Sequence, residues 1–318
     1  AMVARYSTIE VGYQGIANSA LASTLIVAII GLLMGTMVLT STAYGAEDYK
    51  KCGRIWRRSI PYSLVIGLVG FVICLFGEPI LLFLGQTEDV ARGGGEVIAV
   101  LSIGIPMVAL MLSSQFFLEG INRPLPGMVL MLIANILNIF LNWTLVWGHL
   151  GFEPMGVIGS AWATNIVRIF LAISMLCYVI FALDREKFGL FEKADTTWKS
   201  WKKLRHIGYA AGFTNTIEHL GFAALYIFAG LLGTISLGAL TIAFTTFGVP
   251  FMICYGVAGA TAVRVGIALG RKDRQDMALA GLCGLAFNGM ICLPLMVILI
   301  LFPTQIASLF STDVLLIA

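Results

Sequence analysis

Glu218 is a carboxylate in a long apolar part of the sequence, and it is the residue with the clearest capacity for chemistry. From His219 to Val263 the chain has no Asp, Glu, Lys or Arg. An ionisable group inside an apolar span is costly and marks a functional site by default. A carboxylate there can bind Na⁺ or take up a proton, and either event lets an ion gradient bias a conformational equilibrium. The structural alternative is a partnership with His219 or Arg168.

Three asparagines form a second polar group within an apolar stretch. Asn135, Asn138 and Asn142 are spaced by three and four residues, which places them on one face of a helix. Their amide oxygens can coordinate a cation, and their amides can bind a substrate. The alternative is hydrogen bonding between helices, which Asn side chains commonly provide in membrane bundles. Arg168 lies about a third of the way into its own apolar stretch, where it can snorkel, pair with Glu218 or contact a substrate.

Motifs for enzymatic chemistry are absent from the sequence. We find no HExxH, GxSxG, Walker or GxGxxG pattern, and the three His residues are scattered. The six Cys residues show no CxxC or zinc-type spacing and are interpreted as small core residues. We therefore expect no enzyme and no cofactor, with Na⁺ or H⁺ possible as a coupling ion.

The composition predicts a membrane protein that positions these residues on helices. Of the 318 residues, 59% are hydrophobic and 12% charged, and the mean hydropathy is +0.93. These values exclude a soluble domain and a disordered chain. Helical spans of about 20 apolar residues can be drawn in eight places. The expected spans are Gly15–Tyr44, Ser59–Leu84, Val97–Glu119, Pro124–Leu150, Gly156–Leu183, Ile207–Leu231, Ala239–Leu269 and Met277–Phe302.

Basic residues predict the orientation of these spans. Loop 45–58 has five Lys and Arg residues, the turn before Pro124 has one, loop 184–206 has seven and loop 270–276 has three, whereas the opposite loops have only Arg92. Because Lys and Arg are retained on the cytoplasmic side, the basic loops are expected there, in a multi-pass protein of the cell (inner) membrane. This placement explains the net charge of +3 without nucleic acid as a partner.

An internal repeat appears when the sequence is shifted by about 225 residues. Residues 45–48 (GAED) then align with 270–273 (GRKD), and residues 84–88 align with 309–313. One period holds six spans, so the copies form a parallel repeat with a binding site expected at their interface. The repeat predicts eight of twelve helices in this chain, which is expected to be truncated at both ends. It also predicts a whole protein of about 440 to 450 residues, and no transport by this chain alone.

The same comparison predicts the domains. We expect an N-terminal lobe over 1–184 that lacks its first helix, a cytoplasmic linker over 185–206 and a partial C-terminal lobe over 207–318. The linker combines basic residues with Trp198 and Trp201. Such a segment can lie on anionic headgroups or can be a plain solvated linker.

Two segments resemble the multidrug and toxic compound extrusion family. Residues 126–148, with Asn138 and Asn142, followed by 156–164 look like its fifth and sixth helices, and residues 259–270 resemble the end of its eighth helix. The resemblance covers essentially the whole chain and implies two six-helix lobes, a V-shaped cavity and export of organic, often cationic compounds in exchange for Na⁺ or H⁺. It places Glu218 at the cation-coupling carboxylate of the seventh helix, and the two asparagines at a pair linked to cation or substrate binding.

The resulting hypothesis is an all-α, polytopic, cation-coupled antiporter that works by alternating access as a monomer on small molecules in the lipid bilayer. The alternatives are a lipid-linked sugar flippase of the same superfamily, a membrane scaffold or a membrane-embedded enzyme. The residues expected to couple the cation are Glu218, Asn138 and Asn142. The residues expected to line the substrate cavity are Asn135, Phe222 and Arg168.

Overall fold

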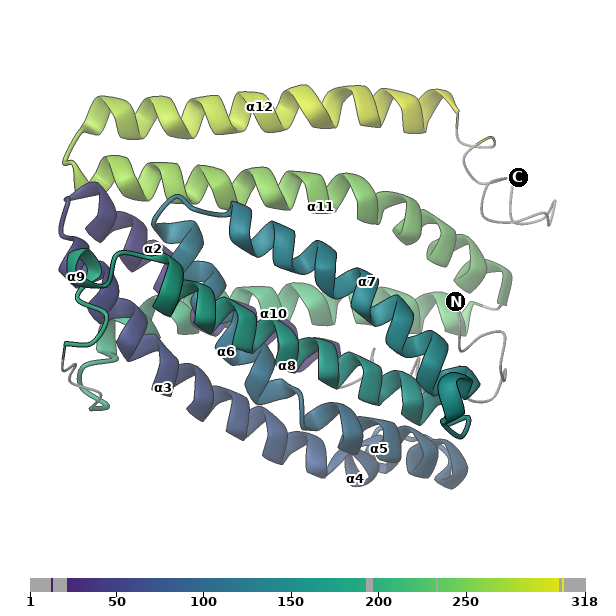
Figure 1. Cartoon of the computed structure of the whole chain (residues 1–318). Helices are drawn as coiled ribbons and strands as arrows, with labels where there is room; N and C mark the ends of the chain where they lie inside the picture. The colour runs from purple at the N-terminus through teal and green to yellow at the C-terminus, as the bar shows by residue number, and fades with distance from the viewer. Residues whose placement is uncertain (1–12, 14–21, 193–196, 233, 303–304, 306–318) are drawn as a thin grey trace. The chain divides into compact units, whose positions relative to one another are not determined.

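The computed structural model describes residues 13, 22–192, 197–232, 234–302 and 305, and all regular secondary structure in these residues is helical. The predicted all-α fold is therefore confirmed, and Figure 1 shows the helices. They are α2 (Ser23–Gly45), α3 (Tyr49–Leu75), α4 (Gly77–Phe83), α5 (Glu88–Ser102), α6 (Ile105–Gly120), α7 (Leu125–Trp147), the 3₁₀ turn η3 (His149–Gly151), α8 (Gly156–Ala182), α9 (Arg185–Phe188), α10 (Lys202–Leu231), α11 (Thr234–Gly270) and α12 (Arg274–Leu301).

Six of the described helices are long and apolar enough to cross a membrane: α2, α3, α7, α8, most of α11, and α12. A seventh span results if α5 and α6, which are bent by 45° at a short break, count as one. Pro106 stands in the first turn of α6, so this break falls where a proline interrupts the expected span. The eighth expected span, Ile207–Leu231, is helical within α10, but its central polar residues make it less apolar than the others.

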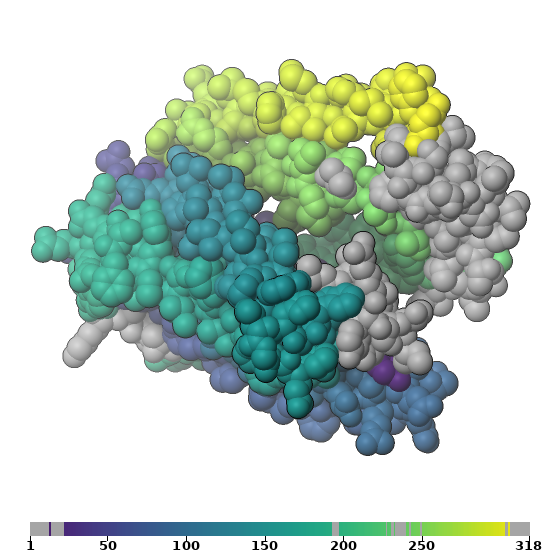
Figure 2. Space-filling model, turned by 45° about the vertical axis from the view of Figure 1, so that its right-hand side comes forward, coloured from purple at the N-terminus to yellow at the C-terminus, as the bar shows by residue number. Residues whose placement is uncertain are grey.

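The chain divides into two compact units, and each has its own packing. The first contains residues 1–44 and 48–216, and the second contains 45–47 and 217–318. In the first unit, α6 packs against α3 and α8, and α7 packs along α8. In the second unit, α11 and α12 lie side by side (Figure 1), and the surface of α12 is exposed along its length (Figure 2). The division falls within α10, and the expected lobe boundaries at 184 and 207 remain a prediction.

The turn between α2 and α3 has a repeated counterpart between α11 and α12. Glu47 and Lys272, which are 225 positions apart, both adopt a left-handed backbone, with φ of 59° and 60°. The following residues, Asp48 and Asp273, each cap the next helix by accepting a backbone N–H, at 3.1 Å and 2.9 Å. Each also donates its own N–H to the carbonyl five residues earlier. The two turns that the predicted repeat aligns share this geometry, whereas the other aligned stretch, 309–313, lies outside the described residues, and the repeat as a whole stays a prediction.

Small residues bring α2 and α10 into close contact within the first unit. Each helix carries two glycines four residues apart, Gly31 and Gly35 on α2 and Gly208 and Gly212 on α10. A methyl group on Gly31 would meet the backbone of Gly212, and one on Gly208 would meet the backbone of Leu32. Glycine pairs at this spacing let transmembrane helices approach closely enough for backbone contact. The contact fixes the N-terminal half of α10, the helix that carries Glu218 further along.

Hydroxyl groups join α3 to α6 in the interior of the first unit. Ser59 and Ser113 share a hydrogen bond of 2.6 Å, and the indole N–H of Trp56 donates to the hydroxyl of Ser114 at 3.3 Å. All four side chains are buried. Such bonds between helices replace the water that an apolar environment lacks.

Candidate functional site

Two of the three asparagines on α7 form a hydrogen-bonded pair. The Asn142 amide donates to the backbone carbonyl of Asn138 at 2.8 Å and to its side-chain oxygen at 3.1 Å. The amide of Asn135 donates to the carbonyl of Met131 at 2.9 Å, and its side chain is exposed. The structure therefore places all three on α7, as predicted, and joins Asn138 to Asn142. The Asn138 side-chain oxygen has a second lone pair that a cation can use.

Glu218 begins a row of residues on one face of α10, in the second unit. Phe222 and Tyr226 follow it at intervals of four residues, so the three side chains lie along the same face. Both aromatic rings contact Phe244 of α11. The Phe222 ring meets it edge to face at a centroid distance of 5.4 Å, and the Tyr226 ring is tilted at 5.3 Å. The Glu218 carboxylate is exposed, and the rings beside it are half-buried.

The aromatic row continues along α11. Phe247, Phe251 and Tyr255 follow Phe244 at helical spacing, with consecutive centroid distances of 5.6 Å from Phe247 to Phe251 and 6.2 Å from Phe251 to Tyr255. These α11 rings were not among the predicted site residues, although their spacing of three, four and four residues was visible in the sequence. An acidic group near a row of aromatic faces is chemically suited to organic cations, because ring faces attract positive charge.

Arg168 contacts the break between α5 and α6 in the first unit. Its guanidinium donates to the carbonyl of Leu101 at 3.2 Å, and the buried amide of Asn165, one turn earlier on α8, donates to the carbonyl of Val100. At the end of α5 these carbonyls also accept backbone N–H groups, Val100 from Ile103 and Leu101 from Gly104, and a positive charge is favourable at the C-terminal end of a helix. Arg168 therefore has a structural role that the sequence did not indicate, and Asn165 was missed. A contact of Arg168 with substrate or with Glu218 stays a prediction.

A second carboxylate near a span lies on α6. The amide of Gln115 donates to Glu119 at 2.9 Å, and both side chains are half-buried. Sequence reasoning treated Glu119 as the end of an expected span and did not consider it as a site residue. The pair with Gln115 at i and i+4 was the available signal.

Clusters of three or more His, Cys, Asp or Glu side chains that could hold a metal ion are not found among the described residues. Oxygen atoms suited to Na⁺ are available instead from the Glu218 carboxylate in the second unit and from the asparagine amides on α7 in the first.

Comparison with known proteins assigns the chain to a family. The family model described as MatE matches residues 1–144 and 210–318, one match in each predicted copy of the repeat. The chain belongs to the MatE family. Among its relatives, a probable multidrug resistance protein NorM of Caulobacter vibrioides is 34% identical over 98% of the chain. The multidrug resistance protein NorM of Aliivibrio fischeri is 28% identical over 89% of the chain. The chain spans 66% and 62% of the length of these two relatives.

Solved structures of transporters share the fold. The eukaryotic MATE transporter AtDTX14 aligns with 99% of the chain and 70% of its own length at a TM-score of 0.85 and 20% identity. A MOP superfamily transporter from Pyrococcus furiosus, described as having a binding pocket of reversed polarity, aligns with 97% of the chain and 70% of its own length at a TM-score of 0.76 and 18% identity. These matches show the fold, whereas the MatE family match supports the resemblance drawn from the α7 and α11 segments and, with the apolar helices, a multi-pass membrane protein.

Proposed function

We propose that this chain is part of a secondary exporter that moves organic, often cationic compounds across the cell membrane in exchange for Na⁺ or H⁺. The observation that carries the proposal is the position of Glu218 at the end of an aromatic row on α10 and α11. Relatives named as multidrug resistance proteins support the same class of substrate.

The proposed mechanism is competition for one carboxylate. An amphipathic cation places its charge near Glu218 and its apolar rings against Phe222 and Phe244. A proton or Na⁺ arriving from outside neutralises Glu218, which removes the attraction for the compound and favours the outward-facing state. Differential binding of the two ligands to two states is sufficient to drive such alternation. The membrane potential supplies about 2.3 kcal/mol per charge per 100 mV, so one coupled cation can sustain a gradient of tenfold or more.

The proposal also includes the expected roles of the α7 asparagines, the orientation of the loops and the oligomeric state. Asn138 and Asn142 supply amide oxygens for the coupling cation, and Asn135 lines the path of the substrate. The basic loops face the cytoplasm, and the exporter acts as a monomer. The flippase alternative is less well supported, because Arg168, the cation on which it rested, donates to the carbonyl of Leu101.

The test is efflux of a fluorescent organic cation from vesicles that contain the intact protein, with Na⁺ and pH gradients imposed separately. Glu218→Gln keeps the size of the side chain and removes its charge, and it is expected to abolish gradient-driven efflux. Glu153→Gln, at an exposed position before α8, is the matched control and should leave efflux unchanged. Unchanged efflux in Glu218→Gln would refute the proposed coupling role.

A further inference from the structure

A pocket of about 530 Å³ lies in the first unit between the end of α2, the beginning of α3 and the beginning of α10 with the segment before it. Half of its lining side chains are basic, and none of the described residues that line it is acidic. The basic residues are Lys51, Arg54, Arg58, Lys199, Lys202 and Lys203. They come from two loops, 45–58 and 184–206, that lie about 140 residues apart in the sequence. The fold therefore gathers two separate basic segments around one space.

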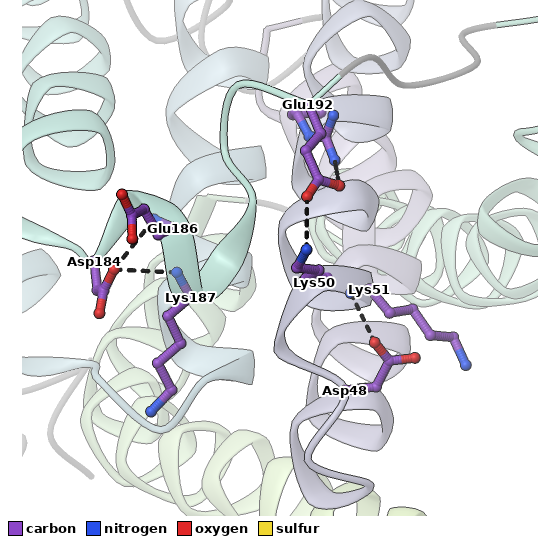
Figure 3. A network of polar contacts seen from close by, with 8 residues as sticks. Asp48, Lys50, Lys51, Asp184, Glu186, Lys187 and Glu192 are labelled. Atoms are coloured by element: carbon purple, nitrogen blue, oxygen red, sulfur yellow. Dashed lines mark hydrogen bonds and ion pairs between the residues drawn. The ribbon is translucent and has the colours of Figure 1, made fainter.

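Two described acidic residues of these segments, Glu192 and Asp48, do not line the pocket and have hydrogen-bond or ion-pair partners. Figure 3 shows the Glu192 carboxylate turned toward Lys50. Its oxygens form ion pairs with Lys50 at 3.1 Å and with Arg57 at 4.0 Å. In the same view the Lys51 side chain points away from Glu192, and Asp48 accepts the backbone N–H of Lys51. Like charges that share a pocket repel one another, and a bound anion relieves that repulsion. The positive charge of the pocket therefore favours the binding of an anion with several negatively charged oxygens.

The remaining lining and the surroundings favour a lipid as the source of that anion. Leu39, Ile55 and Leu204 form an apolar part of the lining. The helices that contribute to the pocket start or end beside it, so it lies at the end of the spans. Trp198, which is 56% exposed, is close in sequence to Lys199, and tryptophan is enriched where membrane meets water. Basic pockets between membrane helices on the cytoplasmic side suit phosphate-containing headgroups.

We propose that this pocket binds the phosphate of an anionic phospholipid headgroup, with its apolar side against the glycerol and the first acyl carbons. The basic side chains interact with the phosphate oxygens through charge-assisted hydrogen bonds. Free inorganic phosphate offers the same oxygens without the apolar part. The proposal does not depend on the transported compound or on Glu218.

The test is native mass spectrometry of the purified chain in detergent. It is titrated with phosphatidylglycerol, with phosphatidylcholine of the same acyl chains, or with inorganic phosphate. We expect saturable binding of phosphatidylglycerol, at least tenfold weaker binding of phosphatidylcholine, and no displacement of the lipid by equimolar phosphate. Lys199→Gln with Lys203→Gln should weaken phosphatidylglycerol binding by about 25-fold, since each basic residue near a membrane surface contributes a factor of roughly five.

The matched control removes the same number of charges elsewhere. Arg92→Gln with Arg123→Gln changes two exposed cations outside the pocket, and it should alter binding by less than twofold. The single variant Lys199→Gln, in the segment before α10, tests the same site with the least change to the fold and should weaken binding roughly fivefold. Equal binding of the two lipids, displacement by equimolar phosphate, or equal losses in the double variant and its control would each overturn the proposal.

Discussion

Replacing Gly208 by alanine tests the close contact between α2 and α10. A methyl group at this position would meet the carbonyl oxygen of Leu32 and would lie 2.9 Å from its carbonyl carbon and 3.1 Å from its Cα. All three atoms are backbone, so no side chain can rotate away and the two helices must separate. Gly212 differs in this respect, because a methyl group there would first meet the flexible side chain of Leu32, at 3.2 Å.

Two opposing contributions determine how much Gly208→Ala is expected to change the free energy of unfolding. Alanine stabilises a helix relative to glycine by about 1 kcal/mol where the methyl group has room. Overpacking against atoms that cannot move costs roughly 1 to 3 kcal/mol. Gly208→Ala should therefore be neutral to destabilising by about 2 kcal/mol. Gly221, on the same helix, has no atom within 4 Å of the added methyl group, so Gly221→Ala should be stabilising.

The assay is equilibrium unfolding in mixed detergent micelles, followed by circular dichroism for wild type and the three alanine variants. The expected order of the free energy of unfolding is Gly221→Ala highest, Gly212→Ala intermediate and Gly208→Ala lowest. If Gly208→Ala were as stable as Gly221→Ala, the described contact between α2 and α10 would be refuted.

Two further variants and one oxidation experiment test other contacts. Arg168→Gln should lower the free energy of unfolding by about 1.5 to 3 kcal/mol through loss of the bond to Leu101; unchanged stability with weaker substrate binding would favour the substrate role instead. The Cys254 and Cys292 sulfurs are 2.8 Å apart, so mild oxidation should join α11 to α12 in a disulfide that peptide mass spectrometry detects; two alkylated thiols would contradict the pairing of these helices. Asp273→Ala should lower the free energy of unfolding, measured with a chemical denaturant, by about 1 kcal/mol through loss of the helix cap. An unchanged free energy of unfolding would argue against the cap.

The sequence predicted the features that depend on local pattern. The hydropathy of single segments located the spans. The repeat was visible because glycine and aspartate recur at the same places, at Gly45 and Asp48 and again at Gly270 and Asp273, and each aspartate caps the helix that follows. Glu218 and the α7 asparagines were conspicuous because polar groups are rare in apolar segments. Their proposed roles in coupling stay predictions.

Features that depend on contacts distant in sequence could not be predicted. Nothing in the sequence connects Arg168 with a carbonyl 67 residues earlier, because that contact depends on how α8 packs against α5. The contact between the glycines of α2 and those of α10 likewise joins residues about 180 positions apart in the sequence. Both basic loops were expected on one side of the membrane, whereas their convergence on one pocket required the packing of three helices.

The repeated turn also bears on how this membrane topology can evolve. The left-handed position is occupied by an acid in one copy, Glu47, and by a base in the other, Lys272, although the backbone is the same. Its geometry therefore places little constraint on the charge of that side chain. Because membrane orientation follows Lys and Arg in the loops, a duplicated copy can acquire or lose topogenic charge at this position without rebuilding its helical hairpin.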